Sequence, residues 1–305
     1  MPMSFNQSVI EEFRANEGKV GGPFEGGDLL LLTTTGARSG AENTTPLGYV
    51  RDGDLLLIVG SAGGSHRHPD WYHNLLAHPM VRVEIGKQTY GAIAVPAEGE
   101  RRDLLFERVV RAAPGYADYQ AGTDRILPVV VLERSEPDAV EAEAAGKAGP
   151  ANLAEKLVEI HTWLRAQLEH VRAEADDHFA ARAAHQGPGA PPAPGLGLQL
   201  RQHCLAFCES LTFHHTSEDA HMFPVLARSH PHLSDVFARL AEEHRTVARV
   251  QGELHALLAD AGTADPGRFR TELDRLTTEL TAHLDYEEES LLPVLAAIPF
   301  PPTAP

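Results

Sequence analysis

Cysteine and tryptophan are scarce in this chain of 305 residues, which contains two of each. The two cysteines, Cys204 and Cys208, lie four positions apart in an apolar stretch, which suits reduced core thiols better than a disulfide framework or a zinc ribbon. Hydrophobic runs of about 18 residues, the length needed to span a membrane, are also missing. The first residues lack the basic and then apolar order of a secretory signal. These absences predict a soluble, cytoplasmic protein.

Basic residues are too few to balance the acidic ones, since 26 Lys and Arg stand against 43 Asp and Glu and the formal net charge is −17. Such a charge disfavours nucleic acid as a partner. Residues 1–135 carry 13 basic and 17 acidic residues, whereas residues 136–305 carry 13 and 26. Thirteen of the 17 histidines also lie after residue 135. Metal chemistry is therefore expected in the second part of the chain.

The length of the chain predicts two domains rather than one. Residues 1–135 alternate short apolar runs with Gly, Asp and Pro, a pattern that predicts a small antiparallel β-barrel with a few helices. Hairpin turns are expected at 51–54 and 86–87. The expected strands are 28–34, 45–50, 54–60, 80–85, 90–95 and 127–132, and the expected helices are 69–77 and 98–112.

Residues 136–150 have no periodic apolar residues and are predicted to form a solvated linker. From 151 to 298, apolar residues recur at spacings of three and four, which predicts helices throughout. These helices are expected at 152–185, 198–229, 233–260 and 266–297, with a Pro/Gly-rich loop at 187–196. The fold class is therefore an α+β split barrel followed by an all-α antiparallel four-helix bundle.

Each predicted helix has a histidine within its apolar periodicity, and two of these four histidines are followed four residues later by a glutamate: His214 by Glu218, and His283 by Glu287. Four residues advance about 40° beyond a full helical turn, so each pair directs two ligands at one spot. The other two helices each contribute a single histidine within their apolar periodicity. Imidazoles with carboxylates suit iron or manganese, whereas zinc prefers four ligands, often thiolates. The candidate metal ligands are His161, His214, Glu218, His244, His283 and Glu287.

An alternative interpretation is that these histidines belong to an ordinary acidic bundle and are satisfied by hydrogen bonds. Four buried imidazoles without a metal would be costly to desolvate, which favours the metal site. Five further histidines are expected to be solvated or to lie outside the ligand set: His215, His221, His230, His232 and His255.

The segments LRQHCLAFCESLTFHHTSEDAHMFPVL, RLAEEHRTV and AHLDYEEESLLPVL resemble a hemerythrin-like, or HHE cation-binding, domain. This resemblance implies two irons, terminal histidines, two bridging carboxylates and a small pocket for dioxygen, nitric oxide or peroxide. Oxygen-carrying members have two histidines on the third helix, whereas this chain has His244 alone, with Leu240 and Ala248 four positions away. An open coordination position is expected. Glu288 competes with Glu287 as the bridging residue.

In the first domain, residues 31–51 and 60–79 place Gly, Ser and Thr beside a strand end or a helix start, where backbone N–H groups can cradle phosphate. Glycine-rich turns are more often turns alone. Together with 113–134, however, these segments resemble the deazaflavin-dependent nitroreductase and quinone reductase family, a split β-barrel relative of flavin-binding reductases, over residues 24–134. The resemblance implies coenzyme F420, in preference to FMN, and hydride transfer to a quinone, nitro compound or similar acceptor.

By motif position, the first two segments would bind the cofactor and Tyr116 would face the acceptor, with Tyr116 or Tyr119 as proton donor. The cofactor-binding candidates are Ala37, Arg38, Ser39, Asn43, Thr44, Thr45, Pro46, Leu47, Gly48, Val59, Gly60, Ser61, Ala62, Asp70, Trp71, Tyr72 and Asn74. Trp71 and Tyr72 alternatively pack their helix onto the sheet. Family members carry basic residues at the positions of Ala37, Asn43 and Ala62, which are uncharged in this chain. His66, Arg67 and His68 could replace some of the missing positive charge.

Three functional hypotheses follow. In the first, a deazaflavin-dependent reductase domain is combined with a di-iron domain that acts on dioxygen, peroxide or nitric oxide. In the second, the bundle is a sensor or store and the barrel is a non-catalytic module for dimerisation or for a hydrophobic ligand. In the third, the barrel is the working reductase and the bundle only protects it from oxygen. A homodimer formed through the barrel is a further expectation.

Overall fold

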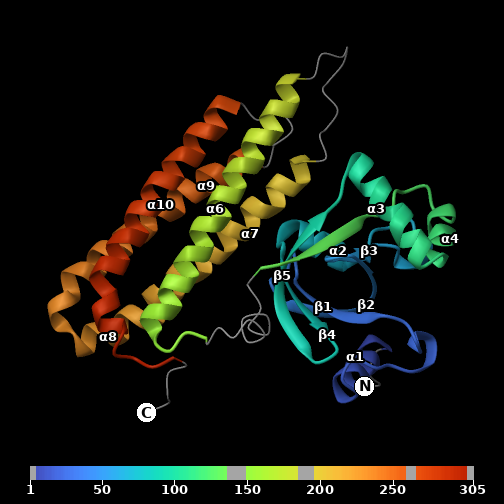
Figure 1. The fold of residues 1–305 in the computed structure, drawn as a ribbon, viewed down its shortest axis with the longest axis horizontal. Coiled ribbons are helices and arrows are strands. Elements are labelled where there is room, and N and C mark those ends of the chain that lie inside the picture. The colour runs from blue at the N-terminus through green and yellow to red at the C-terminus, as the bar shows by residue number, and fades with distance from the viewer. Residues whose placement is uncertain (1–4, 136–148, 185–195, 259–265, 301–305) are drawn as a thin grey trace. The chain divides into compact units, whose positions relative to one another are not determined.

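The computed structural model describes residues 5–135, 149–184, 196–258 and 266–300. The chain divides into two compact units, one built on a β-barrel and the other on long helices, as the sequence predicts (Figure 1). The predicted linker at 136–150 and the predicted loop at 187–196 lie almost wholly outside the described residues.

The barrel unit contains six antiparallel strands that close in the order β1-β2-β3-β6-β5-β4. The strands are β1 (Leu29–Thr35), β2 (Glu42–Asp52), β3 (Leu55–Val59), β4 (Met80–Ile85), β5 (Gln88–Pro96) and β6 (Val129–Arg134). The hairpin turns contain Gly53 and Gly86 at φ values of 61° and 57°, a backbone conformation that favours glycine. All six expected strands are confirmed, and the fold class of this unit is an antiparallel closed barrel.

Strand β2 starts three residues earlier than the sequence predicts. Glu42 and Asn43 are poor strand formers, so their composition argues against a strand. Their pairing with Thr35 and Thr34 of β1 extends the ladder, and Thr33 and Thr44 share a hydroxyl hydrogen bond of 2.9 Å just beyond them. Tertiary pairing thus outweighs local propensity here.

The helices of this unit are α1 (Phe5–Ala15), α2 (Asp70–Ala77), α3 (Gly99–Ala112) and α4 (Gly115–Ala121), together with the short 3-10 turns η1 (Gly22–Phe24) and η2 (Ala62–Gly64). Helices α2 and α3 confirm the prediction, whereas α1 and α4 were not expected. Helix α1 buries Val9, Ile10 and Phe13 against Leu29 and Leu31 of β1. That cover explains why Leu29–Leu32 are buried on both faces of the strand instead of alternating.

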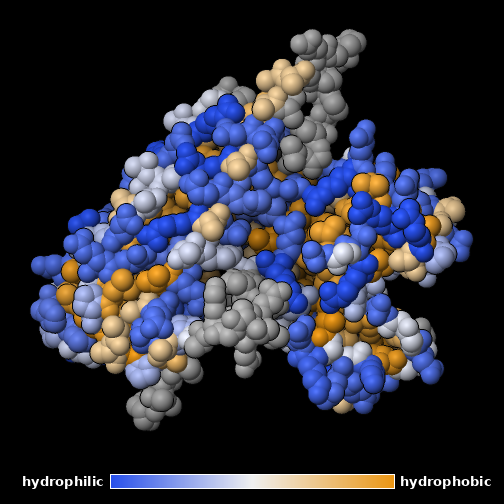
Figure 2. Space-filling model, viewed as in Figure 1, coloured by the Kyte–Doolittle hydropathy of each residue, from blue (hydrophilic) through white to orange (hydrophobic). Residues whose placement is uncertain are grey.

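The remaining helices are α6 (Leu153–Ala184), α7 (Leu196–Ser217), α8 (Phe223–Ser229), α9 (Ser234–Leu258) and α10 (Pro266–Leu295), with a 3-10 turn η4 (Pro231–Leu233) before α9. The start of α7, up to Ala206, belongs to the compact unit of the barrel, and the helical unit contains the rest of these helices. Helix α10 packs against both α9 and α6. On the face shown in Figure 2, hydrophilic residues predominate over these helices, as expected where each helix buries one side. Among the described helices, none combines the length and hydropathy needed to cross a membrane.

The helix predicted at 198–229 is interrupted by a π-helical segment, η3 (Glu218–Met222), between α7 and α8. Pro224 lies in the first turn of α8 and has no N–H, so it cannot donate to the carbonyl four residues earlier and would clash with it. A wider turn relieves that clash. The irregular turn begins at Glu218, one of the predicted metal ligands.

Candidate metal centre and cofactor site

Two groups of buried histidines and glutamates lie together inside the helical unit. In each group, one nitrogen or oxygen atom per residue lies within 4.8 Å of those of the other members. The first group is His161, His214, Glu218 and Glu287, and the second is His215, His244 and His283. All six predicted ligands therefore come together, although they lie on four helices far apart in sequence.

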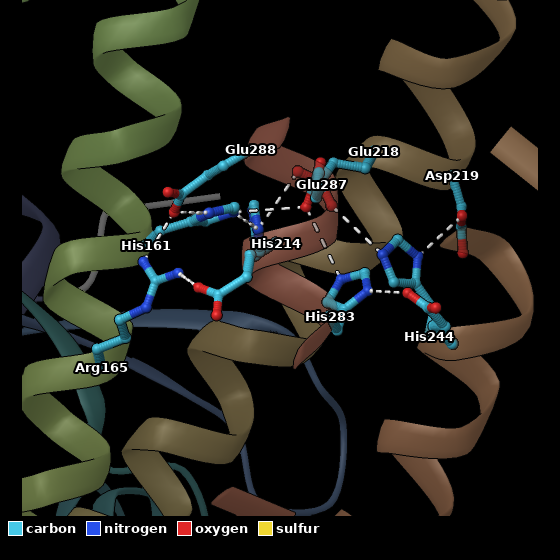
Figure 3. A network of polar contacts seen from close by, with 11 residues as sticks. His161, Arg165, His214, Glu218, Asp219, His244, His283, Glu287 and Glu288 are labelled. Carbon is cyan, nitrogen blue, oxygen red and sulfur yellow. Dashed lines mark hydrogen bonds and ion pairs between the residues drawn. The ribbon is translucent and has the colours of Figure 1, made fainter. Parts of the chain in front are cut away.

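Glu218 contacts an imidazole of each group (Figure 3). Its Oε1 lies 3.3 Å from His214 Nε2 in the first group, and its Oε2 lies 3.6 Å from His244 Nε2 in the second. The four-residue step from His214 to Glu218 brings the first contact, and the π-helical turn places the carboxylate between α7 and α9. A carboxylate in this position can bridge two cations.

Glu287 occupies the equivalent position on α10. Its Oε2 lies 3.5 Å from His161 Nε2 and 3.7 Å from His283 Nε2, and its side chain is fully buried. The neighbouring Glu288 instead accepts hydrogen bonds from His161 Nδ1 at 2.8 Å and from Arg165 Nη1 at 2.7 Å. Of the two rival glutamates, Glu287 thus faces both groups and Glu288 lies behind His161.

Carboxylates also lie behind two histidines of the second group. His244 Nδ1 lies 3.0 Å from Asp219 Oδ1, and His283 Nδ1 lies 3.0 Å from Glu243 Oε2. A neutral imidazole that donates Nδ1–H to a carboxylate keeps its lone pair on Nε2. His161 is held in the same way. Three imidazoles are thereby fixed with Nε2 directed at the centre, an arrangement common behind metal ligands.

Several inward-facing atoms have no hydrogen-bond partner among the residues that the structure describes. They are His215 Nε2, Glu218 Oε2, His244 Nε2, His283 Nε2 and both carboxylate oxygens of Glu287. Leaving a buried acceptor unsatisfied costs about 1–3 kcal/mol, and more for a charged group. Cations bound among these lone pairs would satisfy all of them at once, so the donor set fits a metal pair.

Burial controls the charge of this centre. Burial lowers the pKa of His214 to about 3 and also lowers the pKa values of His215 and His244, so these imidazoles are neutral at physiological pH. Burial, together with the charge of Glu287, raises the pKa of Glu218. Burial alone would raise the pKa of Glu287, but its interaction with His161, 3.5 Å away, outweighs burial and lowers that pKa to about 2.

His215 was expected to be solvated or outside the ligand set, and the expectation of a solvated side chain is wrong. The side chain is 5% exposed and its ring stacks on His244 with centroids 4.0 Å apart. The sequence signal was the dipeptide His214-His215, in which the first histidine belongs to the HxxxE pair and the second was set aside. Adjacent helical residues point about 100° apart, so both can face a bundle interior lined by several helices.

An apolar layer lies beside the second group. Phe223 stacks on His244 with ring centroids 5.6 Å apart, and it packs with Phe237 and Leu240 in a buried cluster at this end of the helical unit. Such a layer keeps bulk water away from the imidazoles and strengthens their electrostatic interactions.

In the barrel unit, Asn74 of α2 contacts one other cofactor-binding candidate, Ala37, and also Thr34 of β1. Its Oδ1 accepts a hydrogen bond from the backbone N–H of Ala37 at 3.0 Å, and its Nδ2 donates to Thr34 Oγ1 at 3.1 Å. Gly36 lies in the same turn, and glycine is required there because a side chain would clash with Ser39 Oγ. Asn74 thus anchors the exposed turn that carries Arg38 and Ser39.

Tyr116 and Tyr119 form a pair on α4 with ring centroids 6.0 Å apart. Tyr116 Oη lies against Gly48 of β2, and the Tyr119 backbone lies against Gly64 of η2. Burial, and to a lesser extent Tyr119, raises the pKa of Tyr116 above the ordinary value of 10.0. The predicted proton donors are therefore close to two predicted cofactor-binding segments.

The remaining candidates are distributed over neighbouring elements. Asn43, Thr44, Thr45, Pro46 and Leu47 lie in β2, Val59 ends β3, Gly60, Ser61 and Ala62 follow it, and Asp70, Trp71 and Tyr72 begin α2. Trp71 is 6% exposed and belongs to the barrel core, as the packing interpretation predicts. Its neighbour Tyr72 packs against the same core.

Arg125 is a cation that the sequence interpretation did not single out. Its guanidinium donates hydrogen bonds of 2.7 Å to the carbonyl oxygens of Ser61 and Ser65, and it lies 3.2 Å from His68 Nδ1. These contacts fix the turn that contains Ala62, one of the three positions where family members carry a basic residue and this chain does not. Because neutral groups hold Arg125 in these contacts, its positive charge remains available to an anion.

A closed antiparallel barrel and a buried His/Glu centre in a helical unit define a two-domain protein with a candidate metal site. The family model described as F420H(2)-dependent quinone reductase matches residues 6–134, and the one described as hemerythrin HHE cation binding domain matches residues 152–295. The F420H(2)-dependent quinone reductase of Mycobacterium tuberculosis is 43% identical over 126 residues, which cover 40% of this chain and 85% of the relative.

Two solved structures are also similar. One, of an F420-H2 dependent reductase, is 40% identical, covers 35% of this chain and 94% of that chain, and has a TM-score of 0.33. The other, described as a domain-swapped dimer, is 37% identical, covers 41% of this chain and 92% of that chain, and has a TM-score of 0.35. The chain belongs to the F420H(2)-dependent quinone reductase family, a family of oxidoreductases, and carries a C-terminal hemerythrin HHE domain.

Proposed function

We propose that the helical unit binds a pair of non-haem iron ions, with manganese as the alternative metal. The observation that carries this proposal is that Glu218 and Glu287 each contact imidazoles of both groups. Helical bundles hold metal pairs through carboxylates shared in this way. A donor set of imidazoles and carboxylates suits iron or manganese.

Bound iron would supply one-electron redox chemistry and a position for dioxygen, peroxide or nitric oxide. The chain itself supplies the orientation of the ligands. Asp219, Glu243 and Glu288 hold the Nδ1 protons of three imidazoles, so that each Nε2 presents its lone pair. Phe223 and its apolar neighbours exclude water from one side.

Metal content of the purified full-length chain tests this proposal. We expect about two irons per chain, the number that carboxylate-bridged bundles hold, and loss of both in a His214→Ala, Glu218→Ala variant that keeps its far-UV circular dichroism. A His255→Ala variant, which removes an exposed imidazole of α9, should keep its iron. A folded wild-type chain that binds neither iron nor manganese would disprove the metal centre.

For the barrel unit, the proposal is F420H2-dependent reduction of a quinone. A bound reduced deazaflavin supplies a hydride, which with one proton converts a quinone to a quinol. Arg125 and the neighbouring Arg67, with Arg38 on the opposite turn, would hold the anionic part of the cofactor. Tyr116 would donate the proton, because its phenol is protonated at physiological pH and its Oη lies against Gly48, one of the predicted cofactor-binding residues.

The rate of quinone reduction against pH tests the role of Tyr116. A raised phenol pKa means that the protonated donor persists to alkaline pH, so activity should decline only above pH 10, the ordinary tyrosine value. A Tyr116→Phe variant should be slower and lack this alkaline decline, whereas Tyr119→Phe should retain it. An unchanged profile in Tyr116→Phe would remove Tyr116 from the reaction.

Together these proposals describe an oxidoreductase that combines a quinone reductase with a metal centre for small oxidants. The rival proposal, a sensor or store with a non-catalytic barrel, predicts metal binding without consumption of reductant. Turnover of reduced F420 with a quinone separates the two, because only the first proposal predicts it.

A further inference from the structure

His215 is a buried imidazole that does not belong to the six predicted metal ligands. Its Nε2 has no hydrogen-bond partner among residues 5–135, 149–184, 196–258 and 266–300. The ring stacks on His244 at 4.0 Å with an interplanar angle of 12°, and its centroid lies 5.0 Å from that of His283. Ligand atoms of these three imidazoles lie within 4.8 Å of one another. A buried lone pair without a donor is costly unless a cation or a proton occupies it.

The third long helix, α9, cannot supply a second imidazole to this group. The positions four residues from His244 are occupied by Leu240 and Ala248, and Leu240 is fully buried in the apolar cluster. On α7, one residue advances about 100° around the helix. His214 therefore faces His161, at 3.1 Å between their Nε2 atoms, while His215 faces the second group.

We propose that His215 is a metal ligand that completes a three-imidazole group with His244 and His283. The inference rests on the proposed metal-binding function and extends it to a residue outside the predicted set. Helix α7 then contributes one histidine to each position of the pair and fills the coordination position left open by α9. The two positions become unequal, with two imidazoles at one and three at the other, and both are contacted by Glu218 and Glu287.

The test uses the full-length chain with His215→Phe and His215→Gln. Phenylalanine keeps a ring to stack on His244 but offers no nitrogen, whereas glutamine keeps a polar group without an imidazole. His221→Gln, which removes an exposed imidazole six residues later, is the matched control. Fe²⁺ is added anaerobically, metal per chain is measured by mass spectrometry, and affinity is measured by chelator competition, with far-UV circular dichroism as the check of folding.

We expect both His215 variants to lose one of the two ions, or to bind it at least about tenfold more weakly, while the control matches the wild type. A His215→Phe protein that keeps both ions at wild-type affinity would show that the ring only stacks. That result would leave the proposed metal pair intact and would show that His215 is not one of its ligands. A wild-type chain that binds no metal would instead overturn the proposed function itself.

A measurement on the wild type covers the case in which the variants do not fold. In the Co²⁺-loaded protein, each ligating imidazole contributes one hyperfine-shifted, solvent-exchangeable N–H proton resonance. Two histidines in the first group and three in the second predict five such resonances. Four resonances would remove His215 from the ligand set.

Discussion

Glu287 and Glu288 are adjacent in sequence but meet opposite sides of the same histidine. Glu287 lies 3.5 Å from His161 Nε2, and neither of its carboxylate oxygens has a hydrogen-bond partner among the described residues. Glu288 accepts a hydrogen bond from His161 Nδ1. In the proposed metal centre, Glu287 would bind metal and Glu288 would orient His161. Their substitutions should therefore have different effects.

We expect Glu287→Gln to abolish binding of at least one ion, because an amide lacks the charge and the second acceptor atom that a shared carboxylate provides. Glu288→Gln should keep the metal stoichiometry and lower the affinity by about 10- to 100-fold, as is typical when a group behind a ligand is changed. Chelator competition on both variants measures the difference. Equal losses would contradict the separate roles.

Arg125 should matter for cofactor affinity more than for turnover. Its bonds to the Ser61 and Ser65 carbonyls hold the turn after β3, and charged hydrogen bonds contribute about 1.5–3 kcal/mol each. Arg125→Ala is expected to raise KM for reduced F420 about tenfold or more with a smaller change in kcat. Arg111→Ala, an exposed arginine of α3, serves as control, and a fall in kcat alone would point to another role.

At the scale of secondary structure, side chains cap the start of α6. Asn152 Oδ1 accepts a hydrogen bond from Glu155 N at 2.9 Å, and Glu155 Oε2 accepts one from Ala151 N at 2.7 Å. This pattern satisfies one backbone donor that the first helical turn leaves open and another just before the helix. It also fixes where the helix that carries His161 begins.

Asn152→Ala should lower the free energy of unfolding of the helical unit by about 0.5–2 kcal/mol. Asn152→Ser keeps an oxygen that can accept the same hydrogen bond and should be close to wild type. Urea unfolding followed by the helical circular dichroism signal compares the variants. Equal stability of the alanine and wild-type proteins would show that the cap is dispensable.

Elements with strong periodicity were predictable, and elements set by tertiary contacts were not. The barrel strands follow from β-branched and leucine runs between turn residues, and each long helix follows from its apolar spacing. Helix α1 was not predicted because its apolar residues are buried by packing against β1, a contact that the local sequence does not reveal. The π-helical turn at Glu218 depends on a backbone clash at Pro224 that spacing does not express. His215 was misjudged because sequence alone does not reveal which other helices line the interior.

At the scale of the whole molecule, the two proposed sites would carry chemistry of different kinds. A deazaflavin gives up electrons in pairs as a hydride, whereas iron and manganese change oxidation state by single electrons. A quinone accepts a pair and its quinol returns single electrons, so it can serve both units. If the units cooperate, the quinone should therefore link reduced F420 to the consumption of dioxygen.

Oxygen uptake tests this link in the full-length chain. With reduced F420, a quinone and dioxygen, the iron-loaded wild type should consume dioxygen faster than Glu287→Gln, whose rate should match uncatalysed oxidation of the quinol. Both proteins should reduce the quinone at the same anaerobic rate, because Glu287 lies in the helical unit and Tyr116 in the barrel unit. Equal oxygen uptake by the two proteins, with an oxygen-dependent absorption change in the wild type alone, would instead favour a sensor or store, since ligand binding without turnover consumes no reductant.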